Sequence, residues 1–584
     1  MENFYSAERN VQMLIYLMKM QGVKKVVVSP GATNVTVVAS LQQDPWFEMY
    51  SAVDERSAAY MACGLADESG EPVALSCTGA TASRNYVPGL TEAFYRKLPI
   101  LAITSTQRTG RIGQLVPQVI DRSNIQNDIA VFSTEIPIIH DEEDEWACNV
   151  KINTALLALK HRGGGPVHIN LVTTYCRDFS VKELPKSRVI YRITTKEKFP
   201  EIKESKVAIF VGVHAVWTKR LTEAVEKFCE KYNGVVLCDH TSNYNGKYRV
   251  QYNLVSGQVN HEDQTQKMEL LIDMGEISGA YMRVIPSKVW RVNPDGQIRD
   301  RFKKLEYLFD MDEVDFFEKY NEMDSKNLLD TSYYTNCKEI YQQIESNIPE
   351  LPFSNIWIAQ NTSKLLPENS ILHLGILNSL RSWNFFEISP TISCYCNTGG
   401  FGIDGIVSTL IGSSLVNKSK LHFCVVGDLA FFYDLNAIGN RDIGNNIRIL
   451  LINNGCGTEF RNYSHFAAQF GTDANAYMAA AGHYGRQSSE LVKHYATDLG
   501  FEYITAKNKE EYLNNVKKFT NPELGDKPIL FEVFTNSDME SEALNKINHI
   551  LEDPRSLKKE VKKVAKGILG EKKVAMLKKL TKGD

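Results

Sequence analysis

The sequence predicts an α/β protein made of three doubly wound parallel-sheet domains and a basic helical C-terminal tail. A series of helix, apolar strand and glycine turn occurs three times along the 584 residues, which is the pattern of doubly wound α/β units. The length is sufficient for three separate cores. Charged or proline-containing stretches separate the series, so we expect domains over residues 1–185, 186–350 and 351–545 and a tail over 546–584.

The first domain is expected to open with an amphipathic helix over residues 7–21, because apolar residues recur there at about 3.6 positions. Glu2 and Glu8 in the same region argue against a secretory signal peptide. A strand over 25–29 leads into a Pro-Gly turn, and the further strands expected in this domain cover 72–77, 100–104 and 166–172. This alternation is typical of a doubly wound unit.

The second domain is expected to begin with a strand over 206–212, followed by a basic helix to about Tyr232. The strands expected after it cover 234–238, 270–275 and 289–294. Gly212 stands alone after the first of these strands, and the G-x-G-x-x-G pattern of a dinucleotide site is absent. The sequence of this domain therefore gives no reason to expect FAD or a nicotinamide cofactor.

The third domain contains two apolar strands that end in polar residues. Leu421–Val426 runs into Gly427-Asp428, and after a helical segment Ile447–Ile452 runs into Asn453-Asn454-Gly455. One crossover would place Asp428 and Asn454 at the carboxyl edge of a parallel sheet, where α/β proteins bind ligands. Oxygen ligands at that edge suit Mg²⁺ with a diphosphate. The alternative is an Asp N-cap followed by an unrelated Asn-rich turn.

Composition excludes several classes of function. The formal net charge of −4 gives no global footprint for nucleic acid. The eleven cysteines show no zinc spacing, and we expect reduced thiols in a cytoplasmic protein. No uncharged apolar run reaches the roughly 18 residues of a membrane span. These features predict a cytoplasmic protein without a transmembrane segment.

Two motifs of the first domain favour a ligand site. Asp54-Glu55-Arg56 opens an Ala/Met-rich helix whose small residues permit close packing against a neighbour. The strand that follows leads into Thr78-Gly79-Ala80-Thr81, where a ligand can approach the backbone. Taken alone, Glu55 could equally be an acid that stabilises a helix N-terminus.

These motifs, with His373–Phe386, the run from Cys396 to Gly405 and the Gly-Asp and Asn-Asn turns, resemble the thiamine-diphosphate decarboxylase and synthase superfamily. Within it the chain is most similar to the MenD family, the 2-succinyl-5-enolpyruvyl-6-hydroxy-3-cyclohexene-1-carboxylate synthases. The resemblance covers about residues 20–180 and 355–540. It implies a pyrimidine-binding, a central and a diphosphate-binding domain, in that order.

The resemblance implies thiamine diphosphate and Mg²⁺ as cofactors, and FAD is not expected. It assigns Glu55 to hydrogen-bond the aminopyrimidine ring and activate the cofactor, and Ile403 to hold the cofactor in its bent form. The implied cofactor-binding residues are Glu55, Thr78, Gly402, Ile403, Gly427, Asp428, Leu429, Ala430 and Asn454. The implied metal ligands are Asp428, Asn454 and the carbonyl of Cys456.

The resemblance also suggests substrate contacts. Gln118 lies near the position of an active-site glutamine of the family and is the second predicted catalytic residue. Arg108 aligns with a substrate arginine, and Arg381 is a candidate replacement for another. His465 is either an acid–base group or a structural residue. Two arginines that hold substrate carboxylates in the family are absent here. Thr33, which follows Pro30-Gly31-Ala32, stands at the position of one, and Thr398, which precedes Gly399, stands at the position of the other. We therefore expect a substrate pair other than that of MenD.

The implied activity is decarboxylation of a 2-oxo acid followed by transfer of the acyl unit to a carbonyl acceptor, as a transferase or lyase. The alternatives are a simple 2-oxo acid decarboxylase, an acetolactate-synthase-like enzyme and a catalytically silent scaffold subunit. Retention of Glu55, Asp428 and Asn454 together argues against the scaffold. By resemblance, the two ends of the cofactor are bound by different subunits, so a homodimer or homotetramer is expected.

The C-terminal tail has a different composition. Residues 553–584 carry eleven Lys or Arg against four Asp or Glu, with apolar residues at helical spacing. This pattern predicts one or two basic amphipathic helices. They would lie on the surface of the protein, or they would bind an anionic membrane surface or a partner protein.

Overall fold

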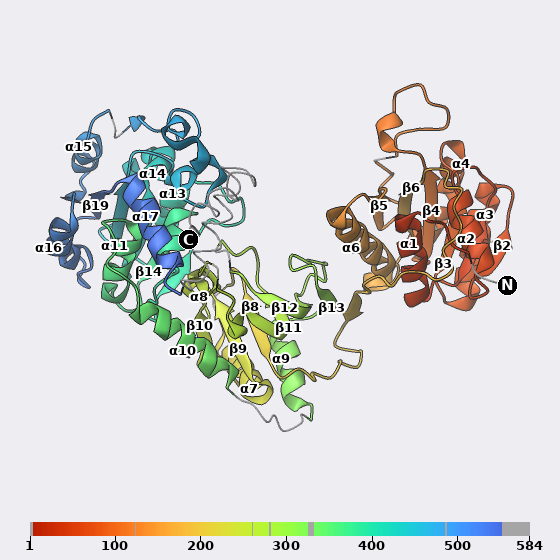
Figure 1. Ribbon diagram of the computed structural model, residues 1–584, viewed down its shortest axis with the longest axis horizontal. Helices are drawn as coiled ribbons and strands as arrows, with labels where there is room; N and C mark the ends of the chain where they lie inside the picture. The colour runs from red at the N-terminus through yellow and green to blue at the C-terminus, as the bar shows by residue number, and fades with distance from the viewer. Residues whose placement is uncertain are drawn as a thin grey trace, which may run out of the picture. The chain divides into compact units, whose positions relative to one another are not determined.

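The structure is a computed structural model that describes residues 4–122, 124–215, 217–259, 261–279, 282–324, 332–484 and 487–551. The chain forms two compact units (Figure 1). The first holds Met1–Lys198 and Asp295–Asp310, and the second holds Phe199–Pro294 and the chain from Met311 onward. The predicted C-terminal helices after residue 551 lie outside the described residues.

The first unit contains a six-stranded sheet with the order β2-β1-β3-β4-β6-β5, and every pairing is parallel. Its strands are β1 (Lys25–Val28), β2 (Glu48–Ser51), β3 (Val73–Cys77), β4 (Ile100–Thr106), β5 (Phe132–Ile136) and β6 (Val167–Val172). Its helices are α1 (Arg9–Met20), α2 (Val35–Gln43), α3 (Glu55–Ser69), α4 (Thr81–Asn85), α5 (Val87–Arg96) and α6 (Glu142–Ala158).

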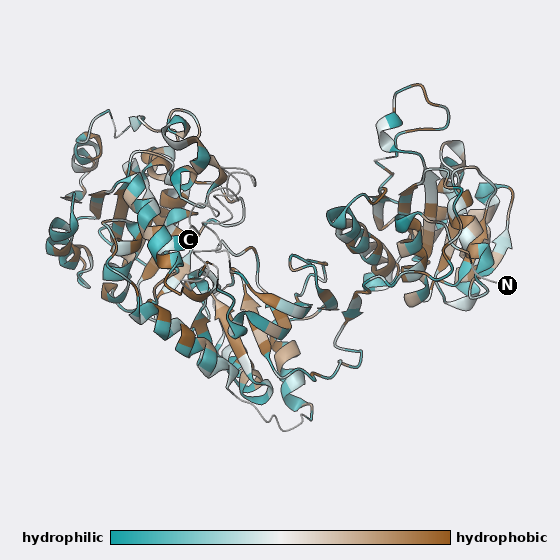
Figure 2. Ribbon diagram, viewed as in Figure 1, coloured by the Kyte–Doolittle hydropathy of each residue, from teal (hydrophilic) through white to brown (hydrophobic). Residues whose placement is uncertain are grey.

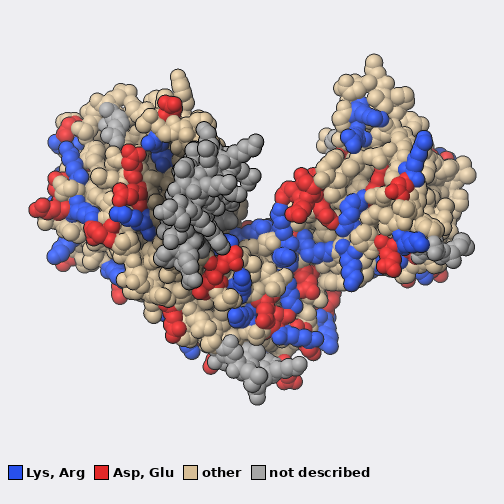
Figure 3. Space-filling model, in the orientation of Figure 1, with Lys and Arg blue, Asp and Glu red and all other residues tan. Residues whose placement is uncertain are grey.

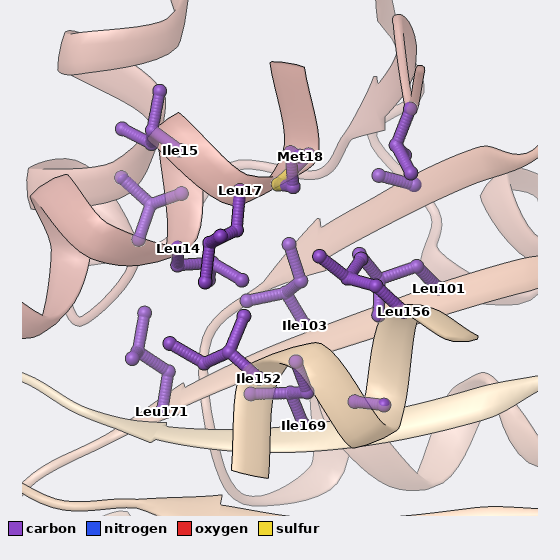
Figure 4. Close-up of a cluster of buried hydrophobic side chains, with 14 of the residues drawn as sticks. Leu14, Ile15, Leu17, Met18, Leu101, Ile103, Ile152, Leu156, Ile169 and Leu171 are labelled. Carbon is purple, nitrogen blue, oxygen red and sulfur yellow. The ribbon is translucent and has the colours of Figure 1, made fainter. Parts of the chain in front are cut away.

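Each face of this sheet has its own apolar core. Side chains of α1, α2 and α6 pack on one face, and side chains of α3, α4 and α5 pack on the other. Figure 4 shows the first core, in which Leu14 and Met18 of α1 and Ile152 of α6 lie over Ile103 of β4. This arrangement is the doubly wound unit that the sequence predicts.

Close packing in the second core places α3, the helix that begins at Glu55. A Cβ added to Gly89 of α5 would lie 2.5 Å from Cβ of Ala59 on α3. The thiol of Cys63 donates to the Gly89 carbonyl at 3.3 Å. The small residues of α3 therefore allow α5 to approach closely, as the sequence predicts.

The central strands are divided between the two units. In the second unit β10 (Arg249–Gln251), β9 (Gly234–Cys238), β8 (Val207–Val211), β11 (Lys267–Met274) and β12 (Ile285–Val292) pair in that order, all parallel. In the first unit β7 (Tyr191–Ile193) pairs with β13 (Leu305–Phe309). The helices of this region are α7 (Lys219–Tyr232), α8 (Asn253–Ser256), α9 (Glu313–Glu322) and α10 (Tyr333–Ser346).

The second unit also contains a six-stranded parallel sheet with the order β15-β14-β16-β17-β19-β18. Its strands are β14 (Ile371–Leu374), β15 (Ser393–Tyr395), β16 (His422–Gly427), β17 (Ile447–Asn453), β18 (Glu502–Ala506) and β19 (Ile529–Phe534). Its helices are α11 (Asn355–Thr362), α12 (Asn378–Trp383), α13 (Ile406–Val416), α14 (Asp428–Tyr433), α15 (Leu491–Asp498), α16 (Lys509–Phe519) and α17 (Ser537–Asn548).

The three parallel-sheet domains with flanking helices confirm the predicted fold class. Figure 2 shows apolar strands inside the units and hydrophilic residues on the outer sides of many helices. Figure 3 shows that Lys and Arg alternate with Asp and Glu over the visible face, in keeping with the small net charge. Among the described residues, no helix is long and apolar enough to cross a membrane. The predicted boundaries at 185/186 and 350/351 stay predictions.

Candidate active site

Glu55 is the first residue of α3, on the first unit. The carboxylate of Asp54 caps this helix by accepting the backbone N–H of Ser57 at 2.7 Å. Glu55 is half-buried, and its described hydrogen bond is a long one of 3.3 Å, from the amide of Asn85 to Oε2. The cap thus fixes the start of the helix without using Glu55, whose carboxylate is held by one weak contact.

Thr78 lies in the turn after β3 and belongs to a buried hydroxyl network. Its Oγ1 is 2.6 Å from Oγ1 of Thr33, which also donates to the Ser105 carbonyl at 2.8 Å. Thr173 donates to the Thr33 carbonyl at 2.8 Å. Thr33 is 4% exposed, so the position at which the family resemblance expects an arginine is filled here by a small buried hydroxyl residue.

The predicted substrate residues Arg108 and Gln118 both lie on the long segment between β4 and β5, and both are exposed. Gln118 has a positive φ of 64°. A Cβ added to Gly79 would lie 3.5 Å from the Gln118 carbonyl. Gln118 therefore lies beside the Thr78-Gly79 turn, as a residue of the same site would.

Arg122 lies next to this turn and was missed by the sequence analysis. It is 6% exposed, and a Cβ on Gly79 would lie 3.5 Å from its Nη2. Burial lowers the pKa of its guanidinium to about 10, against the opposing influence of Cys77. No pattern in the sequence marks it, because the surrounding residues predict only a polar surface loop.

Asp428 and Asn454 lie at the carboxyl ends of two neighbouring parallel strands, as predicted. β16 and β17 pair in register up to Gly427 opposite Ile452, and Asp428 and Asn454 follow within two residues. Both side chains are buried. Asp428 Oδ2 accepts the backbone N–H of Gly455 at 2.8 Å, and Asn454 Oδ1 accepts that of Cys456 at 3.3 Å. The first of these bonds holds the second turn against the first turn, and the other lies within the second turn.

A cavity of about 120 Å³ lies against these two turns. Asp428 and Asn454 line it, and so do five further residues of the predicted cofactor and metal set, namely Ile403, Gly427, Leu429, Ala430 and Cys456. A Cβ added to Gly427 would meet no atom within 4 Å. The glycine thus leaves open space beside Asp428, and Ile403 is half-buried at the cavity wall. Gly402 precedes it and is exposed.

The donor set fits Mg²⁺ held with a diphosphate. It consists of one carboxylate, one amide oxygen and backbone groups, which are hard oxygen ligands. Within the described residues there is no cluster of three His, Cys, Asp or Glu side chains that could hold a metal. Such a sparse protein set suits an ion that takes its other ligands from phosphate oxygens and water.

Glu540 is a second residue that the sequence analysis missed. It lines the same cavity, is 6% exposed, and accepts the backbone N–H of Asn355 at 3.0 Å and the hydroxyl of Thr535 at 2.7 Å. Burial raises the pKa of its carboxyl to about 7, and the charge of Asp428 acts in the same direction. It ties α17 to the start of α11 behind the predicted metal ligands.

Arg381 lines a larger neighbouring cavity of about 610 Å³, and Leu377 lines both cavities. Nη2 of Arg381 donates to both carboxylate oxygens of Glu459, at 2.8 and 2.7 Å. Thr398 is 4% exposed, and its methyl group would lie 2.8 Å from a Cβ on Gly279. The second position at which an arginine was expected is therefore closed by tight apolar packing.

His465 has a structural role in the described structure. Its Nδ1 accepts the backbone N–H of Ala467 at 3.1 Å and so caps the following short helix. Its ring stacks on Phe466 at 4.5 Å.

The residues predicted for the two ends of the cofactor belong to different compact units. Glu55, Thr78, Arg108 and Gln118 lie in the first unit, and Ile403, Asp428, Asn454 and Cys456 lie in the second. In the second unit Ile403, Asp428, Asn454 and Cys456 line one cavity at the carboxyl edge of a parallel sheet, where α/β proteins bind ligands. In the first unit the Gln118 carbonyl lies beside the Thr78-Gly79 turn.

Comparison with known proteins identifies the relatives of this chain. Residues 9–125 match the family described as thiamine pyrophosphate enzyme, N-terminal TPP binding domain. The chain is 32% identical over 571 residues to the 2-succinyl-5-enolpyruvyl-6-hydroxy-3-cyclohexene-1-carboxylate synthase of Bacteroides thetaiotaomicron, covering 94% of this chain and 99% of that protein. The synthase of Phocaeicola vulgatus is 32% identical with the same coverage, and that of Christiangramia forsetii is 27% identical over 92% of this chain and 98% of its own.

Proposed function

The chain belongs to the 2-succinyl-5-enolpyruvyl-6-hydroxy-3-cyclohexene-1-carboxylate synthase family of thiamine-diphosphate enzymes, and from this premise we propose that it decarboxylates a 2-oxo acid and transfers the remaining acyl unit to a carbonyl acceptor. The observation that carries the proposal is the pair of buried residues Asp428 and Asn454, which lie at adjacent strand ends beside an open glycine. A scaffold protein would need neither residue.

Mg²⁺ would be held by Asp428, Asn454 and the carbonyl of Cys456. Asp428 supplies the charge, since its buried carboxylate already accepts one N–H and has further lone pairs. The cavity beside Gly427 offers space for a diphosphate next to the ion. Leu429 and Ala430 follow at the first turn of α14, whose backbone N–H groups favour an anion.

When bound, thiamine diphosphate supplies a nucleophilic carbon and an electron sink for the loss of CO₂ from a 2-oxo acid. Glu55 would hydrogen-bond the ring nitrogen of the aminopyrimidine and exchange a proton with it. Ile403 would press on the cofactor from the cavity wall, and Gln118 would donate to the reacting substrate beside the Thr78-Gly79 turn. The hydrogen bond from Asn85 to Glu55 is long, so a ligand could replace it at little cost.

We propose a donor and acceptor different from those that yield the product named for the relatives. Thr33 and Thr398 are both buried in tight surroundings, so neither position offers room for the arginine expected from the resemblance. Each absent arginine would remove a charge-assisted hydrogen bond to a carboxylate, worth about 1.5–3 kcal/mol. Efficient turnover of isochorismate with 2-oxoglutarate would contradict this proposal.

We also propose that the active form is a homodimer or a larger homo-oligomer. Exposed apolar side chains accompany both parts of the site. Val53, Tyr60 and Met61 are exposed around Glu55, and Phe466 and Tyr477 are exposed on the segment after the predicted metal turn. Large apolar side chains left exposed near a site favour coverage by a protein partner.

The function is tested by cofactor binding and CO₂ release. Thiamine diphosphate with Mg²⁺ should raise the melting temperature of the protein, and a concentration of 100 times Kd corresponds to about 2.7 kcal/mol of added stability. In Asp428→Asn this shift should be lost, because the amide brings no charge to the ion. Asp442→Asn changes an exposed carboxylate of the same domain and should behave as the wild type.

A scaffold subunit would show no shift with the cofactor and no CO₂ from any 2-oxo acid. A simple decarboxylase would release CO₂ and an aldehyde at the same rate with and without carbonyl acceptors. Product analysis with a panel of 2-oxo acids and acceptors separates these outcomes from the proposed transfer, for which the acceptor must appear in the product.

A further inference from the structure

A cavity of about 610 Å³ lies next to the proposed cofactor cavity in the second unit. Its volume is in the range of small-molecule sites, roughly 300–1,000 Å³. Leu377 lines both cavities and has a φ of 66°, a strained value for leucine that persists only where the surrounding structure holds it. A molecule in the larger cavity would therefore lie beside one in the smaller cavity.

Both arginines that line the larger cavity are paired with carboxylates. Nη2 of Arg381 donates to both carboxylate oxygens of Glu459, which lines the smaller cavity. Arg283 is exposed and forms an ion pair with Glu262 at 3.0 Å. The described residues of the lining include no Asp or Glu. An anionic ligand would have to compete with carboxylates for these arginines, so the cavity favours an uncharged molecule.

Asn253 lines the larger cavity with a buried amide that lacks a partner. Its side chain is 7% exposed, and its Oδ1 has no hydrogen bond among the described residues. Half a turn of the amide exchanges its oxygen and nitrogen, so either group can face the cavity. A buried polar group without a partner costs free energy. A ligand that hydrogen-bonds the amide would remove this cost.

Gln258, another buried amide of the same lining, shows the contrast. Its Nε2 donates to the carbonyls of Leu254 and Ile547 at 3.1 and 2.9 Å, and its Oε1 accepts the backbone N–H of Leu551 at 3.2 Å. Gln258 therefore serves the fold. The amide of Asn253 has no comparable set of bonds to backbone groups, so its polarity calls for another explanation.

The rest of the lining combines neutral polar groups with aromatic rings. The polar groups are the hydroxyls of Ser256, Tyr463 and Ser464 and the amide of Asn548, and the rings are those of Phe385 and Phe401. Hydroxyls and amides can each donate and accept. A ligand with several hydroxyl groups would find partners here, while the rings contact its carbon atoms.

We propose that the larger cavity binds the carbonyl acceptor, and that this acceptor is an uncharged molecule with several hydroxyl groups, such as an open-chain sugar. This inference rests on the proposed function and names its acceptor class. Asn253 is the specificity residue, which hydrogen-bonds a hydroxyl group of the acceptor. A site of this kind discriminates strongly against an analogue without the hydroxyl, because its buried polar group is then left unpaired.

Three aldehydes with four carbon atoms test the acceptor class. D-Erythrose has three hydroxyl groups, butanal has none, and succinic semialdehyde carries a carboxylate instead. With the 2-oxo acid that releases CO₂ fastest, kcat/KM for the product that contains the acceptor should be about tenfold or more higher for D-erythrose than for either analogue. A preference for succinic semialdehyde or butanal would overturn the proposal.

Asn253→Leu removes the amide and keeps a similar volume. It should raise the KM for D-erythrose about tenfold or more, with a smaller effect on kcat, and reduce the preference over butanal. Its melting temperature should equal or exceed that of the wild type, because it removes a buried group without a partner; an amide that only supports the fold would give a lower value. Asn253→Ala is a second variant in case leucine packs poorly.

Asn514→Leu is the matched control, because Asn514 is an exposed asparagine on α16 of the same unit. It should keep the preference of the wild type for D-erythrose. If Asn253→Leu also kept that preference in full, Asn253 would not be a specificity residue and the proposal would be wrong.

Binding without turnover separates this inference from the proposed function. Erythritol and succinate have four carbon atoms and no aldehyde, and saturation-transfer NMR on the full chain detects each of them when bound. Erythritol should give a signal with the wild type that is stronger than that of succinate and is lost in Asn253→Leu. A wild type without an erythritol signal, or an unchanged signal in the variant, would overturn the inference. The melting shift with thiamine diphosphate and Mg²⁺ decides the proposed function independently.

Discussion

At the scale of single residues, Glu55 can be tested without disturbing the fold. Among the described residues its side chain makes one long hydrogen bond, whereas the helix cap is formed by Asp54. We predict that Glu55→Gln lowers kcat for CO₂ release at least about 100-fold, since general acid–base groups contribute roughly 10²–10⁴. The melting temperature should stay within a degree or two of the wild type. Single-turnover CO₂ release and thermal unfolding measure the two effects.

Glu68→Gln is the matched control for this prediction, because Glu68 lies on the same helix and is exposed. It should leave both activity and melting temperature unchanged. If Glu55→Gln retained most of the activity with saturating cofactor, the assigned role would be wrong, and Glu55 would be only a first-turn acid of its helix.

The residues that the sequence predicted well are those next to strand ends. Asp428 and Asn454 follow apolar runs that one crossover would pair as neighbouring parallel strands, and the structure confirms that pairing. Arg122 and Glu540 could not be found in this way. Both are charged residues in polar stretches, and their burial arises from tertiary packing that no local period records. The ion pair of Arg381 with Glu459 was missed for the same reason.

At the scale of elements, the contact between α3 and α5 controls the position of Glu55. A side chain at Gly89 would overlap Ala59 Cβ and approach its backbone carbon at 3.0 Å. We predict that Gly89→Val destabilises the first unit by about 1–3 kcal/mol, as overpacking does, and lowers activity by shifting α3. Gly64→Val, on the same pair of helices, meets nothing within 4 Å and is the control. Urea unfolding measures the free energy of unfolding of both variants. Equal destabilisation by Gly89→Val and Gly64→Val would contradict the packing argument.

A buried histidine joins the central sheet region to the last sheet within the second unit. His240 Nε2 lies 3.0 Å from the Trp383 carbonyl and 2.9 Å from the Phe386 carbonyl, so it carries the proton and donates. Burial lowers the pKa of His240 to about 3. The unfolded chain, with the ordinary value of 6.5, takes up a proton first as pH falls. Stability contributed by neutral His240 is therefore complete above pH 6.5 and is lost between pH 6.5 and 3.

We predict that His240→Gln loses less unfolding free energy than the wild type as the pH falls. Between pH 7 and pH 5 the wild type should lose about 2 kcal/mol more unfolding free energy than the variant, because glutamine does not titrate. Urea titrations at the two pH values give the difference. His494→Gln, an exposed position on α15, should show the pH dependence of the wild type. If the unfolding free energies of His240→Gln and the wild type fell by the same amount between the two pH values, His240 would not control stability in acid.

The elements were predicted best where both faces of a strand are buried. The residues of β3, β8, β9, β16 and β17 are almost all buried, and their apolar runs were visible in the sequence. The short edge strands of the first sheet were not predicted. β2 has the sequence EMYS and is half-exposed, and β5 has the sequence FSTEI with one fully buried residue. Such strands are defined by a neighbour that supplies hydrogen bonds, which their own residues do not reveal.

At the scale of the whole molecule, the residues proposed for the cofactor form two sets, one on each compact unit. The first set includes Glu55, and the second includes Asp428. Each is accompanied by exposed apolar residues, such as Val53 at 79% and Tyr477 at 93% exposure. This surface would be costly for a single copy in water. A closed homodimer with two-fold symmetry would bury it twice and build two sites at once.

This arrangement makes a prediction that separates sites between subunits from sites within one. Glu55→Gln and Asp428→Asn homodimers should each be almost inactive. In a heterodimer of the two variants, a site built between subunits is either doubly mutated or fully wild type. Co-expression with two affinity tags, followed by isolation of the heterodimer, should therefore restore about half of the wild-type activity. If each site were built from one subunit, every site would carry one substitution and the heterodimer would stay inactive. Recovery of activity thus requires that Glu55 and Asp428 of different copies meet at one cofactor.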